Sequence, residues 1–345
     1  MPRKAESTSV TIRDVAAACG LSMSTVSCAL ADRDNVRPET KRIVKEAAAL
    51  LGYFPSHVAQ GLRTGKSWTI GAIVSDISNP FYGKLLRGAQ ETLAEFGYHL
   101  ILCSTDYDPA KQTHYIHYLS QRRVDGLLIA PTASDSADIV TLAGLRLPFV
   151  MLLRSHDTVS TDYVGVDNTA GMRTVMEHLW QMGHRRIGLI LGRHGASPTV
   201  ERLAAYRAFL AERGQAEYPG YVEYGDYSLD AGVYAARKML RLDPRPTAIA
   251  TANDLTALGV MKSCNDLQLK VPQELSLVGW DDIFVAGLPN IELTTLRVPK
   301  WELGMTAARL LQRRIESQDA SARREQIRFK GELVVRHTTS SLEPD

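Results

Sequence analysis

The chain has few cysteines and none of the long apolar runs that mark membrane-spanning proteins. Its 345 residues include four cysteines, Cys19, Cys28, Cys103 and Cys264, which form no Cys-x-x-Cys pair, so no disulfide framework is expected. No apolar run approaches the roughly 18 residues that cross a membrane, and no secretory signal is present. We therefore expect a cytoplasmic protein with no membrane partner.

Catalytic and cofactor motifs are missing as well. The sequence contains no Gly-x-Ser-x-Gly elbow and no His-Glu-x-x-His pair, and no dinucleotide fingerprint follows its predicted first strands. The segment 60–67 ends like a phosphate loop, but Gly61 is one residue too close to Gly65. His114 and His117 share a helical face with no third ligand nearby, which is typical of a surface pair. We expect no enzyme, no metal site and no cofactor.

Charge is distributed unevenly along the chain. The formal net charge is only +2, yet residues 1–66 carry ten Lys and Arg against six Asp and Glu, and the remainder carries thirty against thirty-two. A chain of this length is too long to fold around one hydrophobic core, so two or three domains are expected. The basic N-terminal part is the one expected to meet the phosphates of a nucleic acid.

Residues 11–37 predict two short helices joined by a tight turn. Thr11 is a suitable N-cap with Asp14 as its capping-box partner, Gly20 suits the turn, and Ser22 caps the second helix. The buried side of the pair is expected to comprise Ile12, Val15, Ala16, Cys19, Val26, Ala29 and Leu30. The outward side of the second helix then presents Met23, Ser24, Ser27 and Cys28. This arrangement predicts a helix-turn-helix that reads DNA in the major groove.

A third helix and an extended connection follow. Pro38 begins this helix and Gly52 ends it, with an expected buried stripe of Ile43, Val44, Ala47, Leu50 and Leu51. Tyr53-Phe54-Pro55 leads to a segment at 56–63 that is too short to hold a helix alone in water.

From Thr69 onward, short apolar strands alternate with amphipathic helices. The expected strands lie at 70–75, 98–104, 124–130 and 147–153, and then at 185–192, 247–252 and 275–280. Helices are expected at 81–96, 109–122, 199–213, 229–241, 254–268 and 299–318. Buried strands separated by helices are typical of parallel sheets covered on both faces. The series occurs twice, which predicts two half-domains of similar build.

These segments resemble, in order, the lactose and purine repressor (LacI/GalR) family of bacterial regulators. The blocks that carry the resemblance are TIRDVAAACGLSMSTVS, YFPSHVAQGLR, SNPFY, RVDGLLI, VGVDN, GHRRIGLI, ERLAAYRAFL, TANDLTALG and VPQELSLVGWDD. The resemblance implies an all-α helix-turn-helix headpiece with a hinge helix, joined to an α/β periplasmic-binding-protein-like core of two Rossmann-like half-domains. The implied boundaries are a headpiece at 10–54, a hinge helix and linker at 55–67, a first half at 68–165 with 298–326, and a second half at 166–297 with 327–340.

The resemblance also implies which residues contact DNA. Met23, Ser24 and Cys28 occupy the family's base-reading positions, although Cys28 cannot make the bidentate contact that Arg makes to guanine. Residues placed to grip phosphates are Thr11, Ser22, Thr25, Ser27 and Asn35. In the hinge the residues are Ser56, His57, Ala59 and Leu62, with Leu62 as an apolar wedge between base pairs. The alternatives are local capping for the hydroxyls, edge packing for Met23 and Cys28, and a flexible linker for the hinge.

A small-molecule effector is expected in the cleft between the half-domains, at the carboxyl ends of the strands. By resemblance its contacts are Phe81, Tyr82, Arg202, Tyr227, Asn253 and Asp281. The alternative for the aromatic residues is ordinary core packing. Asp254 is expected to cap the helix that follows it, and Asp76, Arg154 and Asp167 are only possible lining.

The implied function is that of a repressor of sugar or sugar-acid metabolism genes that binds a palindromic operator as a homodimer. The segment at 192–203 lacks the Arg and Thr that purine-responsive relatives place before Arg202, so a nucleobase effector is not expected. A C-terminal heptad segment is missing too, so a dimer is expected rather than a tetramer. The alternative is an activator or global regulator of the same family with a protein or other small-molecule effector. A sugar-binding transport component would need a signal peptide, and a sugar-processing enzyme would need a paired acid and base.

Overall fold

The chain folds as two units. The computed structural model describes residues 10–53, 66–133, 136–145, 147–156, 158–317 and 323–342. One unit ends at Ser67 and the other begins at Trp68. The predicted hinge helix, with its candidate DNA contacts Ser56, His57, Ala59 and Leu62, lies outside the described residues.

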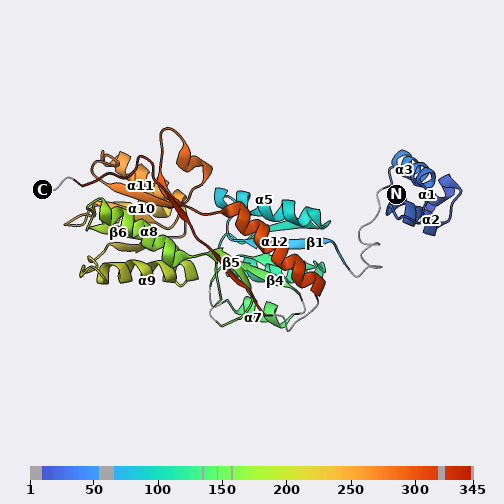
Figure 1. Cartoon of the computed structure of the whole chain (residues 1–345), viewed down its shortest axis with the longest axis horizontal. Coiled ribbons are helices and arrows are strands. Elements are labelled where there is room, and N and C mark those ends of the chain that lie inside the picture. The colour runs from blue at the N-terminus through green and yellow to red at the C-terminus, as the bar shows by residue number, and fades with distance from the viewer. Residues whose placement is uncertain are drawn as a thin grey trace, which may run out of the picture. The chain divides into compact units, whose positions relative to one another are not determined.

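The first unit contains three helices, α1 (Ile12–Cys19), α2 (Met23–Leu30) and α3 (Pro38–Leu51), drawn in blue in Figure 1. The Asp14 carboxylate accepts hydrogen bonds from the amide and the hydroxyl of Thr11, both at 2.8 Å. Gly20 ends α1 at φ 66°, a conformation that costs glycine little. Ser22 Oγ accepts from the Thr25 amide at 3.1 Å, so the predicted start of the second helix is confirmed.

The core of this unit is smaller than the sequence predicts. Its buried apolar residues are Val15, Ala16, Val26, Ala29, Val44 and Ala48. The predicted stripe of α3 is wrong at Leu50, which is 88% exposed, and at Ile43, which is 42% exposed. Leu51 is also exposed. Ile43 and Leu50 are seven residues apart and share a face of α3 that differs from the Val44 and Ala48 face turned to α1 and α2.

The second unit is built on two six-stranded sheets of matching order. The first sheet runs β11-β5-β4-β3-β1-β2 and the second β12-β10-β9-β8-β6-β7. All neighbours pair in parallel except β10 and β12, which are antiparallel. This confirms the predicted fold class for the core, because each half is a parallel sheet covered by helices on both faces.

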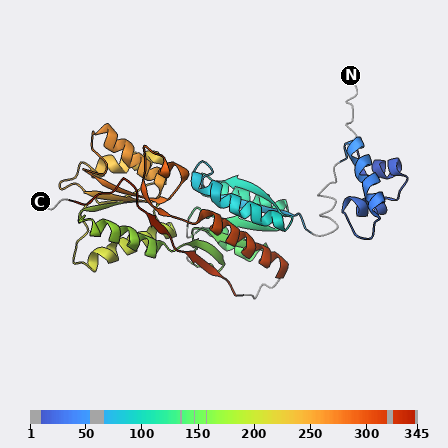
Figure 2. The same ribbon diagram turned by 45° about the horizontal axis from the view of Figure 1, so that its top comes forward.

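The first half contains strands β1 (Thr69–Val74), β2 (His99–Ser104), β3 (Gly126–Ile129), β4 (Phe149–Leu152), β5 (Asp162–Val166) and β11 (Gln326–Phe329). Its helices are α5 (Pro80–Glu95), α6 (Pro109–Gln121), α7 (Ala137–Gly144) and α12 (Lys300–Ser317). Figures 1 and 2 show α5 and α12 side by side on one face of the sheet. Side chains of α6 and α7 pack on the other face, with Ile116, Leu119, Ile139 and Leu142 buried.

The second half contains strands β6 (Ile187–Leu191), β7 (Val222–Tyr224), β8 (Ala248–Thr251), β9 (Ser276–Asp281), β10 (Thr294–Arg297) and β12 (Glu332–Val334). Its helices are α8 (Asn168–Gln181), α9 (Ser197–Ala211), α10 (Leu229–Met239) and α11 (Asp254–Asp266), with a 3-10 turn, η1 (Phe284–Gly287). In Figure 2 the yellow-to-orange helices α10 and α11 and the green to yellow-green helices α8 and α9 lie on opposite sides of the sheet.

The chain passes between the halves three times, after β5, β10 and β11. The predicted return to the second half at residue 327 needs a correction, because Ile327 to Phe329 pair with β5 in the first sheet. The third crossing therefore follows Phe329 and precedes β12. Among the described residues, no helix is long and apolar enough to span a bilayer.

Candidate functional site

The first turn of α2 gathers three hydroxyl groups that the sequence assigns to DNA. Ser22 Oγ lies 2.8 Å from Ser24 Oγ and 2.9 Å from Thr25 Oγ1, so these hydroxyls hydrogen-bond to one another and cap the helix. Local capping, the alternative for Ser22, is therefore present, and an exposed hydroxyl in such a cap can still donate to a phosphate. Met23, beside them, is 47% exposed.

The other predicted DNA contacts differ in accessibility. Thr11 and Asn35 are exposed, whereas Ser27 and Cys28 are half-buried on α2. Their contact with DNA stays a prediction. Lys41 and Lys45 are paired with Asp32, and Arg42 is paired with Glu39 and Glu46.

Three arginines outside the predicted set are exposed on the headpiece. Arg13, Arg33 and Arg37 make no ion pair within the described part of the chain. An exposed guanidinium group without an ion-pair partner is available to neutralise a phosphate.

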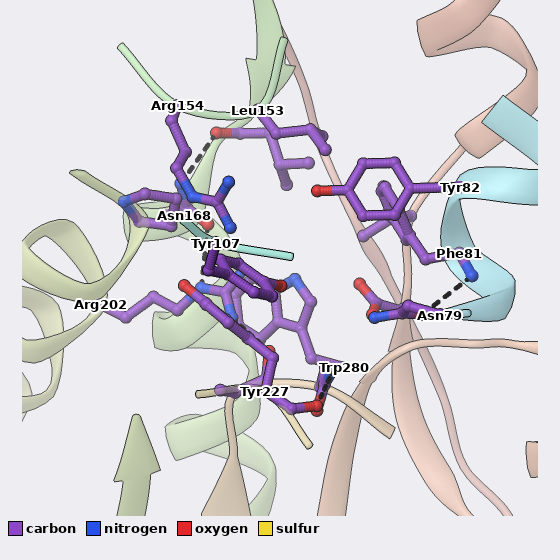
Figure 3. A pocket seen from close by; sticks show the side chains of 16 residues that line it. Asn79, Phe81, Tyr82, Tyr107, Leu153, Arg154, Asn168, Arg202, Tyr227 and Trp280 are labelled. Carbon is purple, nitrogen blue, oxygen red and sulfur yellow. Dashed lines mark hydrogen bonds between the residues drawn. The ribbon is translucent and has the colours of Figure 1, made fainter. Parts of the chain in front are cut away.

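The second unit has a cavity of about 530 Å3, counting the space at its open mouth. All six predicted effector contacts line it, and Figure 3 shows several of them converging from the two halves. The first half supplies Asn79, Phe81, Tyr82, Tyr107, Leu153, Arg154, Val166 and Val298, and the second half supplies Asn168, Pro198, Arg202, Tyr227, Ala252, Asn253, Trp280 and Asp281. Nearly all follow the carboxyl end of a strand, because parallel strands bring those ends to one edge of each sheet.

Arg202 is fixed in the floor of this pocket. Its Nε donates to Asn168 Oδ1 at 2.9 Å and its Nη1 donates to the Ala252 carbonyl at 2.7 Å. Its guanidinium carbon lies 3.6 Å from the centre of the Trp280 ring, a close cation–π contact. Burial lowers the pKa of Arg202 to about 10, so the side chain remains cationic at neutral pH.

Asp281 ends β9 with an uncommitted carboxylate. Its φ is 115°, a conformation that side-chain-bearing residues rarely adopt, and its carboxylate makes no hydrogen bond within the described residues. Burial, followed by repulsion from Asp254, raises its pKa well above the ordinary value, while Lys300 and Arg202 act in the opposite direction. The environment thus favours a neutral carboxyl group that faces the pocket.

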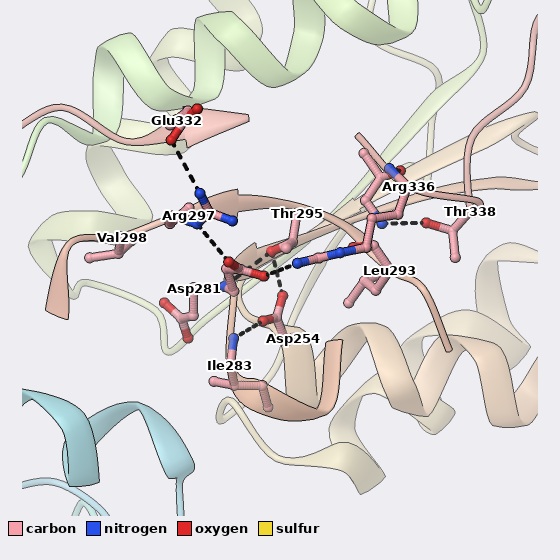
Figure 4. A network of polar contacts seen from close by, with 12 residues as sticks. Asp254, Asp281, Ile283, Leu293, Thr295, Arg297, Val298, Glu332, Arg336 and Thr338 are labelled. Atoms are coloured by element: carbon pink, nitrogen blue, oxygen red, sulfur yellow. Dashed lines mark hydrogen bonds and ion pairs between the residues drawn. The ribbon is translucent and has the colours of Figure 1, made fainter. Parts of the chain in front are cut away.

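The neighbouring acids Asp254 and Asp282 are engaged in structural contacts. Figure 4 shows Asp254 accepting hydrogen bonds from Thr295 Oγ1, at 2.6 Å, and from the Ile283 amide, at 2.8 Å. The prediction that Asp254 caps α11 is wrong, since the cap is Asn253. Asp282 is paired with Arg297 at 2.7 Å and Arg336 at 2.6 Å. These bonds hold the β9 end, and with it Asp281, in place.

Asn253 uses its side chain to position other parts of the site. Its Oδ1 accepts from the Thr256 amide at 2.9 Å, and its Nδ2 donates to the Tyr227 carbonyl at 3.0 Å. Asn253 also lines the pocket. Its hydrogen bond to the Tyr227 carbonyl holds the turn that carries Tyr227.

Two tyrosines stack across the pocket. The rings of Tyr107, from the first half, and Tyr227, from the second, are 5.7 Å apart at an interplanar angle of 15°. The guanidinium carbon of Arg154 lies 5.3 Å and 5.5 Å from their centres. The sequence analysis missed Tyr107, and the signal that could have identified it is its place directly after the β2 strand.

The remaining candidates divide between lining and other roles. Phe81 and Tyr82 pack edge to face at 5.5 Å and belong to the buried core, so they pack and line the pocket at once. Asp76, Arg154 and Asp167 were considered as possible lining residues, and of these only Arg154 lines the pocket. Asp76 accepts from Ser78, and Asp167 caps α8.

Comparison with known proteins agrees with this architecture. Residues 11–56 match the model for bacterial regulatory proteins of the lacI family, and residues 176–339 match that for a periplasmic binding protein-like domain. The chain is 32% identical over 334 residues to the HTH-type transcriptional repressor PurR of Photobacterium profundum, and the match covers 96% of this chain and 99% of the relative.

Two solved structures give the same result. The Lac repressor dimer bound to operator and the anti-inducer ONPF is 27% identical, with a TM-score of 0.84 over 96% of this chain and 100% of that one. The complex of the transcriptional regulator CelR with cellobiose is 29% identical, with a TM-score of 0.72 over 95% and 99% of the two chains. These relatives are transcriptional regulators, which confirms the prediction that the chain is not an enzyme. The chain belongs to the lacI family of bacterial regulatory proteins.

Proposed function

We propose that the protein represses genes of sugar or sugar-acid metabolism in the cytoplasm. In this proposal it binds a palindromic operator as a homodimer through α2, and a small effector in the pocket changes operator affinity. The Lac repressor structure, a dimer on its operator, supports the DNA partner and the dimer, and the cellobiose complex of CelR supports a sugar-type effector.

The observation that carries the effector role is that the pocket is lined from both half-domains. Arg154 and Tyr107 come from the first half, and Arg202, Tyr227 and Asp281 come from the second. A ligand that contacts both halves favours the relative arrangement in which its contacts are best. If the operator affinity of the dimer depends on that arrangement, effector binding and operator binding are coupled. The coupling free energy between two such sites is typically about 1–3 kcal/mol.

Operator recognition is proposed for the exposed start of α2, with Met23, Ser24 and Cys28 at the base edges. Phosphate contacts are assigned to Thr11, Ser22, Thr25, Ser27 and Asn35, with the hinge residues Ser56, His57, Ala59 and Leu62 completing the DNA-binding set. The hydroxyls that cap α2 support this surface, as do the exposed Arg13, Arg33 and Arg37, which make no ion pair among the described residues.

The proposal is tested by Asp281→Ala. We expect this variant to bind an operator selected from random DNA as the wild type does, and to lose effector affinity by roughly 5- to 150-fold, because a buried polar group of the effector loses its hydrogen-bond partner at a cost of about 1–3 kcal/mol. Fluorescence anisotropy of labelled operator, titrated with the protein at rising effector concentration, measures both. Asp76→Ala is the matched control, because Asp76 lies after β1 but does not line the pocket. An unchanged effector response in Asp281→Ala would refute the effector site.

A further inference from the structure

The pocket holds two buried arginines that make no ion pair with a carboxylate of the described residues. Arg154 is 5% exposed and Arg202 is 8% exposed, and neither makes an ion pair within the described residues. Figure 3 shows both side chains reaching into the pocket from the side opposite Tyr82 and Asn79. Burying an unpaired charge is costly, so such sites are stabilised by a counter-ion.

Protein groups satisfy these arginines only in part. Arg154 Nη1 donates to Ser75 Oγ at 2.5 Å and to the Pro131 carbonyl at 3.1 Å. Arg202 uses Nε and Nη1, while its Nη2 donates no hydrogen bond within the described part of the chain. All of these acceptors are neutral, so the positive charge of both guanidinium groups remains. A guanidinium has five N–H donors in a planar fork that matches a carboxylate or phosphate.

The other pocket groups add donors rather than negative charge. Trp280 Nε1 is buried without a hydrogen-bond partner among the described residues, and Trp280 lines the pocket. Asp281 is the single acidic residue in the lining, and burial together with Asp254 raises its pKa, which favours the neutral form that donates. The lining is therefore rich in donors and carries net positive charge.

We propose that the effector carries an anionic group, a carboxylate or a phosphate, which Arg154 and Arg202 receive together. This inference rests on the proposed function, since it takes the pocket as the effector site. Asn79 and the Tyr107–Tyr227 pair line the rest of the space, which suits the hydroxyls and CH faces of a sugar body. The ligand class is a sugar acid or a sugar phosphate.

Matched ligand sets test the anionic group directly. Isothermal titration calorimetry of the full-length protein compares glucose, gluconate and glucose 6-phosphate, and then ribose, ribonate and ribose 5-phosphate. We expect an acid or a phosphate to bind at least about tenfold more tightly than its neutral parent, the effect of one charge-assisted hydrogen bond. The carboxylate and phosphate arms identify which of the two groups is recognised.

Arg154→Met removes the charge and keeps much of the side-chain volume. We expect it to lose the preference for the anion by roughly 10- to 150-fold, with little change for the neutral parent. Arg154→Lys keeps the charge and should retain part of the preference. Arg193→Met is the matched control, because Arg193 lies 5.1 Å from the Tyr107 ring centre but is exposed and outside the pocket lining. It should keep the preference.

Several outcomes would overturn the inference. Tighter binding of a neutral sugar than of its acid and phosphate would do so, as would an anion preference that survives in Arg154→Met. Failure of every acid and phosphate to bind below about 1 mM, a weak affinity for a specific site, would also overturn it. If an acid binds through Arg154 but operator affinity does not change, the anionic pocket stands and the proposed function fails. If a neutral sugar binds more tightly than its acid and phosphate and shifts operator affinity, the proposed function stands and the anionic pocket fails.

Discussion

The position of the Tyr227 ring in the pocket depends on a neighbouring glycine, Gly192. A Cβ atom at Gly192 would lie 2.0 Å from Tyr227 Cζ and 2.2 Å from its hydroxyl oxygen. The ring therefore occupies space that only glycine leaves open. Tyr227 itself has φ 73°, and Tyr107, its stacking partner, has φ 60°, so both rings stand on strained turns.

Gly192→Ala should displace the Tyr227 ring from Tyr107 and weaken effector binding about as much as Tyr227→Ala does. The fold should persist, because the clash falls on the far end of a side chain that can rotate. Calorimetry of the two variants measures the effect, with Tyr227→Phe as a control that keeps the ring. Wild-type effector affinity in Gly192→Ala would show that the tyrosine stack is not part of the site.

The residues of the site were predictable to different degrees. Phe81, Tyr82, Arg202, Tyr227, Asn253 and Asp281 were named by resemblance and all line the pocket. Tyr107 was not, because its place shortly after the β2 strand is only a weak signal without a neighbouring motif. The error at Leu50 has another cause, since a short helix in a small unit buries a narrower face than its apolar residues suggest.

At the scale of elements, each half contains a helix pair in close backbone contact. In the first half, a Cβ at Gly304 of α12 would lie 1.9 Å from the Leu85 carbonyl oxygen of α5, and one at Gly88 would lie 2.3 Å from that of Trp301. In the second half, Gly232 and Gly259 bring α10 and α11 equally close. These glycines let the returning helix α12 pack firmly on the first half.

Gly304→Ala should lower the free energy of unfolding of the core by roughly 1–3 kcal/mol, because the clash is with main chain that cannot rotate away. Thermal unfolding followed by circular dichroism should show a Tm lower by several degrees. Gly83→Ala, on the partner helix α5, is the control: open space surrounds Gly83, and alanine there should leave stability unchanged or raise it by up to about 1 kcal/mol. Equal Tm values for the two variants would contradict the close-packing argument.

Strands with continuous apolar runs were predictable, and less regular ones were not. β7 has only three residues, none fully buried, and β11 alternates exposed and half-buried residues at the edge of its sheet. An edge strand of this kind resembles a loop in sequence. The third crossing was placed before Ile327 by resemblance, and this strand carried no pattern that would have moved it to after Phe329.

At the scale of the whole molecule, resemblance anticipated the two-unit organisation and the paired sheets, and the comparisons confirm the family. The choice of effector depends on side chains such as Arg154, whose role emerges only when both halves are folded together. Charges from strands far apart in sequence meet in one pocket, so composition along the chain does not reveal its net charge.

In the proposed function, the effector pocket and the DNA-binding surface are thermodynamically coupled. The most direct test measures operator affinity with and without the effector found by calorimetric screening, and effector affinity with and without operator. The account predicts that both affinities change by the same factor, about 5- to 150-fold, because coupling of binding sites is reciprocal. Operator affinity that is identical at zero and saturating effector would contradict it.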